Sequence, residues 1–163
     1  MHEVSRVTAC IALGANLGDP VQTVRQALQD LKALPQTQVV RTSSLYRTAP
    51  VEATGPDFIN AVALVETSLS PRALLHALQA LEARAGRERP YRHAPRTLDL
   101  DLIFHGDVQL DTPELTLPHS RWQERAFVLR PLAEIDPERV STAMLDAVRG
   151  QTLQRLHFRR SLN

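Results

Sequence analysis

The stretch FINAVALVETSLSPRALLHALQALEARAG, residues 58–86, contains a complete strand–helix unit. Residues 58–67 form a mostly apolar run of the length and composition typical of a buried strand. Ser70 and Pro71 then predict the start of a helix, because serine is a favoured N-cap and proline is favoured at the first helical position. The apolar face of this helix is formed by Leu74, Leu75, Leu78 and Leu81. Gly86 fits the position just after its end.

A second strand–helix unit precedes this one. Residues 6–13 are rich in small and β-branched residues and predict a buried strand. Residues 14–18 (GANLG) predict a turn, and the Asp-Pro pair at residues 19–20 predicts a helix that ends by Pro35. Residues 38–46 predict another strand, which follows this helix and precedes the unit described above.

The remaining elements complete a recognisable order. Residues 97–104 predict a strand, and residues 142–157 predict a C-terminal helix. The resulting order β-α-β-β-α-β is the ferredoxin-like arrangement, so we expect an α+β sandwich with helices packed on a mainly antiparallel sheet. A length of 163 residues fits one core, so residues 1–163 are expected to form a single domain.

Composition narrows the class of protein further. The chain is 43% hydrophobic and 23% charged, which is ordinary for a soluble globular protein. A net charge of +1 provides no general attraction to nucleic acid or to anionic membranes. The single cysteine, Cys10, lies in an apolar run and is expected to be a buried structural thiol. With no signal-peptide layout and no membrane-spanning run, we expect a cytoplasmic monomer that binds neither nucleic acid nor a membrane.

The most informative polar pattern is Asp99-Leu100-Asp101 in RTLDLDLIF, residues 96–104. Side chains alternate along a strand, so both carboxylates should point to one face, about 7 Å apart. Neighbouring like charges repel each other, which favours a nearby cation. Magnesium is typically held by one or two carboxylates together with substrate phosphates, and two such metal ions side by side suit phosphate-transfer chemistry. The alternative is a solvated polar face on an amphipathic strand.

An arginine-rich segment lies directly before this strand. Residues 84–96 (RAGRERPYRHAPR) contain five arginines and one glutamate, with glycine and proline typical of a loop. Planar guanidinium groups match phosphate oxygens, so the segment could neutralise a metal-bound polyphosphate. A solvated basic loop that balances the two aspartates is the alternative. The glycines of residues 14–18 fit neither a P-loop nor a dinucleotide fingerprint, so ATP would be bound in another way.

These segments together resemble the 6-hydroxymethyl-7,8-dihydropterin pyrophosphokinase family over about residues 7–137. The resemblance is carried by ALGANLGDP, SSLYRTAP, GPDFINAVALVET, LEARAGRER, APRTLDLDLIF, LTLPH and ERAFVLRPLAEIDP. It implies a folate-biosynthesis enzyme that transfers pyrophosphate from ATP to the hydroxymethyl group of a dihydropterin and releases AMP. Two magnesium ions are implied as cofactors, with ATP as the co-substrate and the dihydropterin as the second small-molecule substrate.

The same resemblance implies roles for individual residues. Asp99 and Asp101 would bind both magnesium ions, and together with Arg87 and Arg96, which would clamp the polyphosphate, they form the catalytic set. The implied ATP contacts are Gln79, Glu82, Arg89, Arg92, Leu102, Thr116, His119 and Arg125. The implied pterin contacts are Phe58 and Phe127 on the two ring faces, Asn60 on the polar edge, and the backbone of Thr48 and Val51.

Two other classes of protein remain as alternatives. A two-metal nuclease or an ordinary kinase could also use a carboxylate pair with arginines, although a kinase would release ADP. Ferredoxin-like folds also include RNA-binding domains, but these require exposed sheet aromatics in a defined pattern that this sequence does not contain.

Overall fold

The computed structural model describes residues 5–50, 55–87 and 98–158. The first half of the chain forms β1 (Val7–Ala15), α1 (Pro20–Leu31), β2 (Thr37–Thr42), β3 (Tyr46–Thr48), β4 (Phe58–Thr67) and α2 (Pro71–Arg87). The second half forms β5 (Asp99–His105), β6 (Leu110–Asp111), β7 (Thr116–Leu117), α3 (Ala126–Ile135), α4 (Thr142–Ala147) and β8 (Leu153–Arg155). Single 3-10 turns at Trp122–Glu124 and Pro137–Arg139 flank α3.

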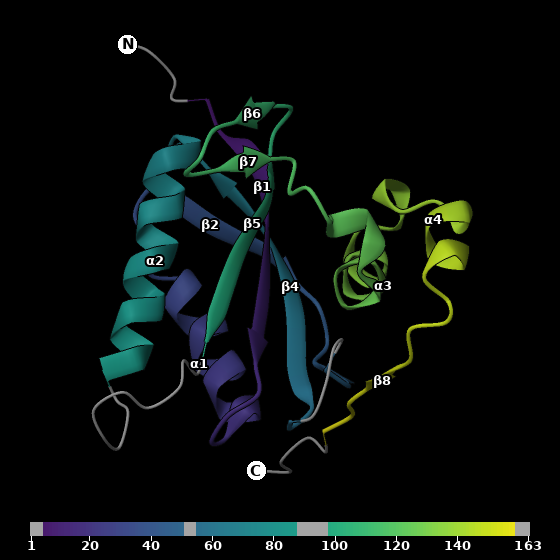
Figure 1. The fold of residues 1–163 in the computed structure, drawn as a ribbon. Helices are drawn as coiled ribbons and strands as arrows, with labels where there is room; N and C mark the ends of the chain where they lie inside the picture. Colours follow the sequence, from purple (N-terminus) through teal and green to yellow (C-terminus); the bar gives the residue numbers. More distant parts are fainter. Residues whose placement is uncertain (1–4, 51–54, 88–97, 159–163) are drawn as a thin grey trace.

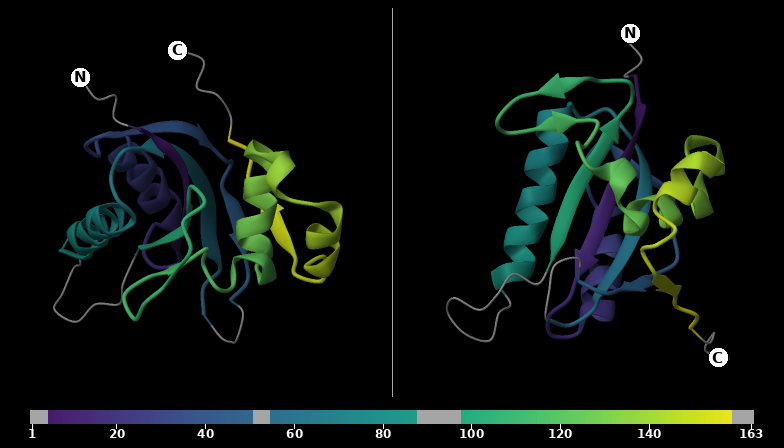
Figure 2. Two further views of the ribbon diagram at one scale, coloured as in Figure 1. Left: turned by 90° about the horizontal axis from the view of Figure 1, so that it is seen from above. Right: turned by 45° about the vertical axis from the view of Figure 1, so that its right-hand side comes forward.

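One antiparallel sheet organises these elements. Its strands follow the order β5-β1-β4-β3-β8, and β2 also pairs with β4. Figure 1 shows α1 and α2 on one face of this sheet and α3 on the other, with α4 beyond α3. The view from above in Figure 2 shows the same layers end-on. Because β1 and β4 are central and each strand–helix unit returns to the sheet, the predicted ferredoxin-like α+β fold is confirmed.

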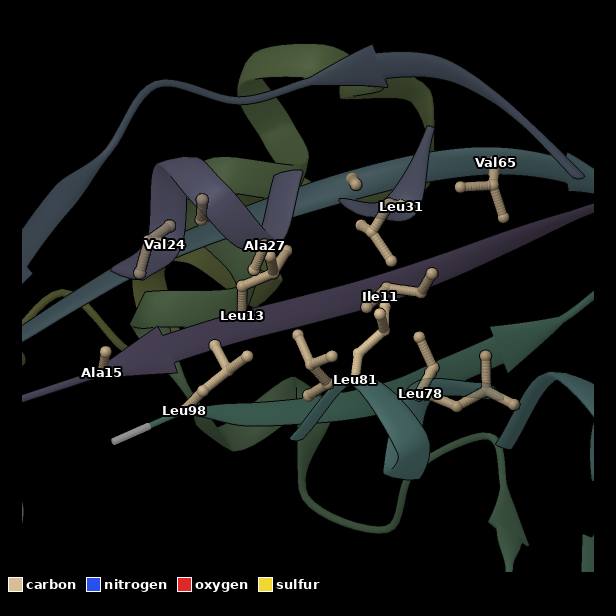
Figure 3. Close-up of a cluster of buried hydrophobic side chains, with 14 of the residues drawn as sticks. Ile11, Leu13, Ala15, Val24, Ala27, Leu31, Val65, Leu78, Leu81 and Leu98 are labelled. Carbon is tan, nitrogen blue, oxygen red and sulfur yellow. The ribbon is translucent and has the colours of Figure 1, made fainter. Parts of the chain in front are cut away.

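Hydrophobic side chains form a core on each face of the sheet. Figure 3 shows the larger cluster, in which Ile11 and Leu13 of β1 pack against Val24 and Leu31 of α1 and against Leu78 of α2. The opposite cluster joins the sheet to α3 and is formed by residues that include Cys10, Val62, Leu129 and Leu132. Cys10 is fully buried, and burial raises the pKa of its thiol, which confirms the predicted structural thiol.

Alternation over residues 98–102, at the start of β5, places three leucines in the larger core. Leu98, Leu100 and Leu102 are all buried there. The register between β1 and β5 shifts between Cys10 and Ile11, which marks a β-bulge or a similar irregularity. After this shift, successive residues 103 and 104 both join the cluster under α3. The strand therefore contributes to both cores while its first residues keep a regular alternation.

The predicted N-cap of the first helix is confirmed. The predictions that Gly14 lies in a turn and that Gly86 follows the second helix are wrong. Asp19 caps α1, because its Oδ1 accepts the Gln22 N–H at 3.2 Å. Gly14 belongs to β1 and not to a turn, since the strand continues to Ala15. Gly86 lies inside α2 rather than after it. The helix continues because Ala85 still packs against the core, and this packing outweighs the low helix propensity of glycine.

The predicted strand over residues 38–46 is interrupted. β2 ends at Thr42 and β3 begins at Tyr46. Between them, the hydroxyl of Ser43 accepts the Val62 N–H at 2.9 Å, and the Ser43 N–H donates to the Val62 carbonyl at 2.9 Å. The Ser43 hydroxyl thus takes the place of the backbone carbonyl that would accept from β4, so the pairing is broken into two segments.

The predicted C-terminal helix over residues 142–157 is mostly wrong. The helix α4 ends at Ala147, and residues 153–155 instead form β8, which pairs with β3. Gly150 lies between the two elements, and the open edge of β3 provides hydrogen-bond partners for an extended segment. Among the helices of the described ranges, none combines the length and the apolar character needed to cross a membrane.

Candidate active site

A single cross-strand row runs over five strands at one end of the sheet. Asp99 of β5 pairs with Gly14 of β1, which pairs with Asn60 of β4, followed by Tyr46 of β3 and Arg155 of β8. Cross-strand partners point to the same face, and neighbouring strands lie ~4.8 Å apart. Two strand spacings separate Asp99 from Asn60, which is a distance of about 10 Å between their backbones.

The acid pair lies on the face of the sheet that also carries α3. Asp101 pairs with Ala12, which belongs to the cluster under α3, whereas Leu100 between the two aspartates is buried in the opposite core. Asp99 is exposed and Asp101 is half-buried. This arrangement agrees with the alternation expected from the sequence. Two carboxylates that share a face and remain accessible provide hard oxygen ligands that fit a divalent cation.

Glu82 connects α2 to the strand that carries the acid pair. Its Oε2 accepts the backbone N–H of Leu100 at 3.2 Å. Leu100 lies between Asp99 and Asp101, so this bond fixes the strand at the point where the carboxylates are presented. An acid in the last turns of a helix is disfavoured by the helix dipole. The bond to β5 offers a structural reason for the acid at this position.

His119 lies beside Asp101 in the wall of one cavity and is half-buried. Its backbone N–H donates to the Ile103 carbonyl at 2.7 Å, which ties the loop after β7 to β5. Its Nδ1 lies 3.1 Å from the Arg121 N–H and accepts it, so the neutral imidazole carries its proton on Nε2. Burial lowers the pKa of His119; the negative charge of Asp101 opposes this, and the charges of Arg125 and Arg121 add to the lowering.

We expect the His119 imidazole of the metal-free protein to titrate below its ordinary value of 6.5. Burial favours the neutral form, so the folded protein binds this proton more weakly than the unfolded chain. The contribution of His119 to folding stability is therefore complete above the unfolded pKa of 6.5, and it decreases as the pH falls from there through the lower pKa of the folded protein. Nuclear magnetic resonance of the ring nitrogens gives the midpoint, with the urea-unfolded chain as the reference. A folded midpoint at or above the unfolded one would contradict the burial of this ring.

A cavity of about 280 Å³ lies at the outer edge of β5, between α2 and the β6–β7 hairpin. Four of the predicted site residues lie together in its wall: Asp101, Leu102, Thr116 and His119. Other wall residues were not predicted from the sequence: Leu75, Leu100, Thr112, Pro113, Glu114, Leu115 and Ser120. The cavity therefore begins at one of the two carboxylates and extends away from the central strands.

The β6–β7 hairpin is attached to α2 by Glu114. One carboxylate oxygen lies 2.7 Å from Nε2 of His76, and the other lies 3.4 Å from Nε of Arg72. Because these side chains are largely exposed, the contacts contribute little to the stability of the fold. Their main effect is to position the hairpin. They set the distance between the hairpin and α2, and hence the width of the cavity.

Three predicted ATP residues of the described chain lie outside the cavity wall: Glu82, described above, Gln79 and Arg125. Gln79 is exposed on α2, and Arg125 is half-buried at the N-cap of α3. The Arg125 guanidinium lies over the Phe127 ring, with Cζ 5.5 Å from the ring centroid. This contact places a cation at the point where α3 begins, next to one of the predicted aromatic residues.

Two of the predicted pterin residues, Asn60 and Thr48, are in direct contact. Asn60 is buried, and its Nδ2 donates to Oγ1 of Thr48 at 2.7 Å. Its Oδ1 lies 2.9 Å from the position that a Cβ on Gly14 would occupy, so the amide leans over the bare backbone of β1. Phe58 and Phe127 are both half-buried, the first at the start of β4 and the second on α3. The sequence predicts a role for the Thr48 backbone in pterin binding. In the structure, the Thr48 hydroxyl also holds the Asn60 amide.

Four predicted site residues, Val51, Arg89, Arg92 and Arg96, lie outside the described residues. Arg87 is the last residue of α2, directly before one of the undescribed ranges. Sequence reasoning also missed the role of Gly14, which leaves room for the Asn60 amide. The available signal was an isolated glycine at the end of an apolar strand pattern, which often marks a close approach of another group.

Comparison with known proteins gives matches to one family. Residues 10–137 match the family model of the 7,8-dihydro-6-hydroxymethylpterin-pyrophosphokinase (HPPK). The 2-amino-4-hydroxy-6-hydroxymethyldihydropteridine pyrophosphokinase of Pseudomonas aeruginosa is 46% identical over 129 residues, 78% of this chain and 80% of that protein. The protein of the same name from Haemophilus influenzae is 45% identical over 130 residues, which cover 79% and 81% of the two chains.

Solved structures support the fold. A Plasmodium falciparum HPPK-DHPS crystal structure with pterin and p-hydroxybenzoate superposes with a TM-score of 0.68 at 14% identity. The match covers 91% of this chain but only 44% of the solved chain, so this chain corresponds to less than half of that protein. With a family model that covers most of its length and relatives above 40% identity, the chain belongs to the 7,8-dihydro-6-hydroxymethylpterin-pyrophosphokinase family.

Proposed function

We propose that the acid pair, the cavity beside β5 and the pocket around Asn60 form one active site for pyrophosphoryl transfer. The chain is a pyrophosphokinase of folate biosynthesis that uses ATP as co-substrate and acts on the hydroxymethyl group of 6-hydroxymethyl-7,8-dihydropterin. The observation that carries the assignment of the site is the cross-strand row. Asp99 and Asn60 lie on one face about 10 Å apart, with only Gly14 between them.

Asp99 and Asp101 would hold two magnesium ions. Their carboxylates are hard oxygen donors on one face, and neither is sealed inside the core, so polyphosphate oxygens can complete the coordination. When bound, the ions neutralise the charge on the polyphosphate and make the transferred phosphorus more electrophilic. Glu82 helps to position this pair, because its carboxylate accepts the backbone N–H of Leu100, the residue between the two aspartates.

The nucleotide would occupy the cavity, with its phosphates at Asp101 and its adenosine toward the β6–β7 hairpin. Leu102 and Thr116 then lie near the adenosine, and the Nε2–H of His119 can donate to a phosphate oxygen without adding a net charge. Gln79, Glu82 and Arg125 would lie at the border of this site. Further phosphate contacts are assigned by resemblance to Arg87, Arg89, Arg92 and Arg96.

The pterin would lie against Asn60 with its ring between Phe58 and Phe127. One hydrogen of the Asn60 amide is engaged by Thr48, which leaves its other N–H and Oδ1 for the polar edge of the ring. A flat heterocycle between two aromatic side chains gains a large contact area. The backbone of Thr48 and of Val51 would complete the recognition of the edge.

In the reaction, the hydroxymethyl oxygen attacks the β-phosphorus of ATP. The bond from this phosphorus to the oxygen that bridges to the α-phosphate breaks, and AMP leaves with the electron pair. The proton of the hydroxyl group passes to solvent or to a phosphate oxygen. The protein contributes mainly by positioning both substrates and by balancing the charge on the phosphates.

We also propose that residues 1–163 act as a single domain and as a monomer in the cytoplasm. Two core clusters share one sheet, which supports a single folding unit. A net charge of +1 favours small-molecule substrates over nucleic acid or an anionic membrane as partners.

Nucleotide products test this function directly. The protein is incubated with ATP, magnesium chloride and 6-hydroxymethyl-7,8-dihydropterin, and the nucleotides are separated by chromatography. We expect AMP that appears only when the pterin is present, and no turnover after chelation of magnesium with EDTA. ADP as the product would identify an ordinary kinase, and the absence of turnover with all components would contradict the proposal.

A further inference from the structure

The C-terminal strand β8 lies beside the proposed pterin pocket, although it falls outside the residues that match the family model. It pairs with β3 on the edge opposite β4, with Leu153 facing Thr48 and Arg155 facing Tyr46. Since Tyr46 in turn faces Asn60, Arg155 belongs to the same cross-strand row as the amide that would recognise the pterin.

The side chains of this region converge on the carboxylate of Glu134 in α3. It accepts the Ser44 N–H at 3.0 Å, the Ser44 hydroxyl at 2.9 Å and the Tyr46 hydroxyl at 2.6 Å. Arg155 completes the set, because Nη2 lies 3.3 Å from the carboxylate and Nε donates to Oγ of Ser44 at 2.9 Å. We call these four residues the Glu134 cluster.

The Glu134 cluster fixes one end of β3. Burial and the bond to Glu134 raise the pKa of the Tyr46 hydroxyl, so it remains a proton donor to the carboxylate. The strand β3 is only three residues long, and Thr48 at its other end accepts the Asn60 amide. A strand this short has few ladder bonds of its own, so its position depends on the groups that hold its ends.

We infer that Arg155 is a positioning residue for the pterin pocket, acting through Glu134 and Ser44 on β3 and thereby on Thr48 and Asn60. This inference rests on the proposed function. Its effect should be confined to the pterin, because the nucleotide cavity lies at the outer edge of β5, at the opposite end of the strand order. Without the guanidinium, Glu134 and Ser44 lose a charged donor, and β3 is held less firmly.

The simpler alternative is that Arg155 makes a surface ion pair of small energetic value. Its side chain is 50% exposed, and such pairs contribute little to stability. The two views differ in their consequence for binding. A surface ion pair would leave the pterin affinity unchanged, whereas a positioning residue would change the pterin affinity and leave the ATP affinity unchanged.

The test uses the full-length protein with Arg155→Ala, and it measures kcat and the KM of each substrate separately. We expect the KM for the pterin to rise about fivefold, in keeping with a weakened charge-assisted hydrogen bond, while the KM for ATP changes less than about twofold. Arg155→Lys, which retains the charge but not both donors, should lie between the two. Tyr46→Phe removes only the hydroxyl from the same cluster and should shift the pterin KM in the same direction.

Arg149→Ala is the matched control. Arg149 is exposed on the same C-terminal segment, and it is not a member of the Glu134 cluster, so its removal changes the net charge equally and should leave both KM values unchanged. An unchanged pterin KM in Arg155→Ala, or an equal rise in both KM values, would overturn the inference. If Arg155→Ala does not fold, Arg155→Lys, which weakens the same contacts to Glu134 and Ser44, decides by the same criterion. A wild-type protein that makes no pterin-dependent AMP would instead refute the proposed function.

Discussion

Asp99→Asn is expected to lower kcat by on the order of 100- to 1000-fold, the range found when one electrostatic contact to a transferring group is removed. Asparagine has the same size but lacks the negative charge, so it binds a divalent cation poorly. Asp99 is exposed at the start of β5 and contributes nothing to either core, so the substitution should leave the fold intact. Pterin-dependent AMP formation gives the rate, and thermal unfolding tests the fold.

Asp107→Asn serves as the control for the loss of a negative charge. Asp107 is exposed just beyond the opposite end of β5, and we expect this variant to keep the wild-type rate. Added magnesium should partly restore Asp99→Asn if the defect is in metal binding. A near-normal rate at low magnesium would show that the acid pair does not hold the metal.

Asn60→Ala is expected to lower kcat/KM for the pterin about 100-fold, because a site built to recognise polar groups loses most when its hydrogen bonds cannot form. The substitution removes the amide that we propose recognises the polar edge of the pterin. It also leaves the Thr48 hydroxyl without the donor that it has in the wild type. The lost buried hydrogen bond should lower the free energy of unfolding by about 1 kcal/mol, which a stable protein tolerates.

Thr48→Ser tests whether the hydroxyl at position 48 is sufficient to hold the Asn60 amide. It keeps the hydroxyl that accepts the Asn60 amide, so we expect only a small change in kcat/KM for the pterin. Steady-state kinetics with each substrate varied in turn provide both values. If Asn60→Ala weakened ATP and pterin equally, or left the pterin unaffected, Asn60 would not be the group that reads the pterin.

Much of the fold follows from local sequence signals. The apolar run over residues 58–67 forms β4 with the predicted bounds, and Asp19 and Pro20 begin α1 as their capping preferences indicate. Alternation in β5 also places Leu100 and Asp101 in different environments, one buried in the larger core and one half-buried. Each of these features depends on neighbours within a few residues, which is the range that sequence patterns describe.

The features that the sequence did not predict depend on distant partners. The strand β8 exists because β3 offers it an edge more than a hundred positions earlier in the chain, as the pairing of Arg155 with Tyr46 shows. Ser43 interrupts a strand through its bond to Val62. Gly86 stays helical because of packing against the core. Tertiary contacts outweigh local propensity in each case.

The site shows the same division. The spacing of Asp99 and Asp101 predicts a metal site on one strand. Their distance from Asn60 could not be predicted, because it depends on the register in which β5, β1 and β4 pair. Roles for the other residues came from the family resemblance. Those of Val51, Arg89, Arg92 and Arg96 stay predictions, because these residues lie outside the described ranges.

The outer edge of β5 has a consequence for the behaviour of the protein at high concentration. An edge strand that offers free backbone groups is a template for a strand from another molecule, and this is a common route to aggregation. Here the Leu100 N–H is bonded to Glu82, and the Ile103 carbonyl accepts the His119 N–H. The contacts that shape the proposed nucleotide cavity therefore also oppose pairing with strands of other molecules, so a mutation that loosens them is expected to lower solubility as well as turnover.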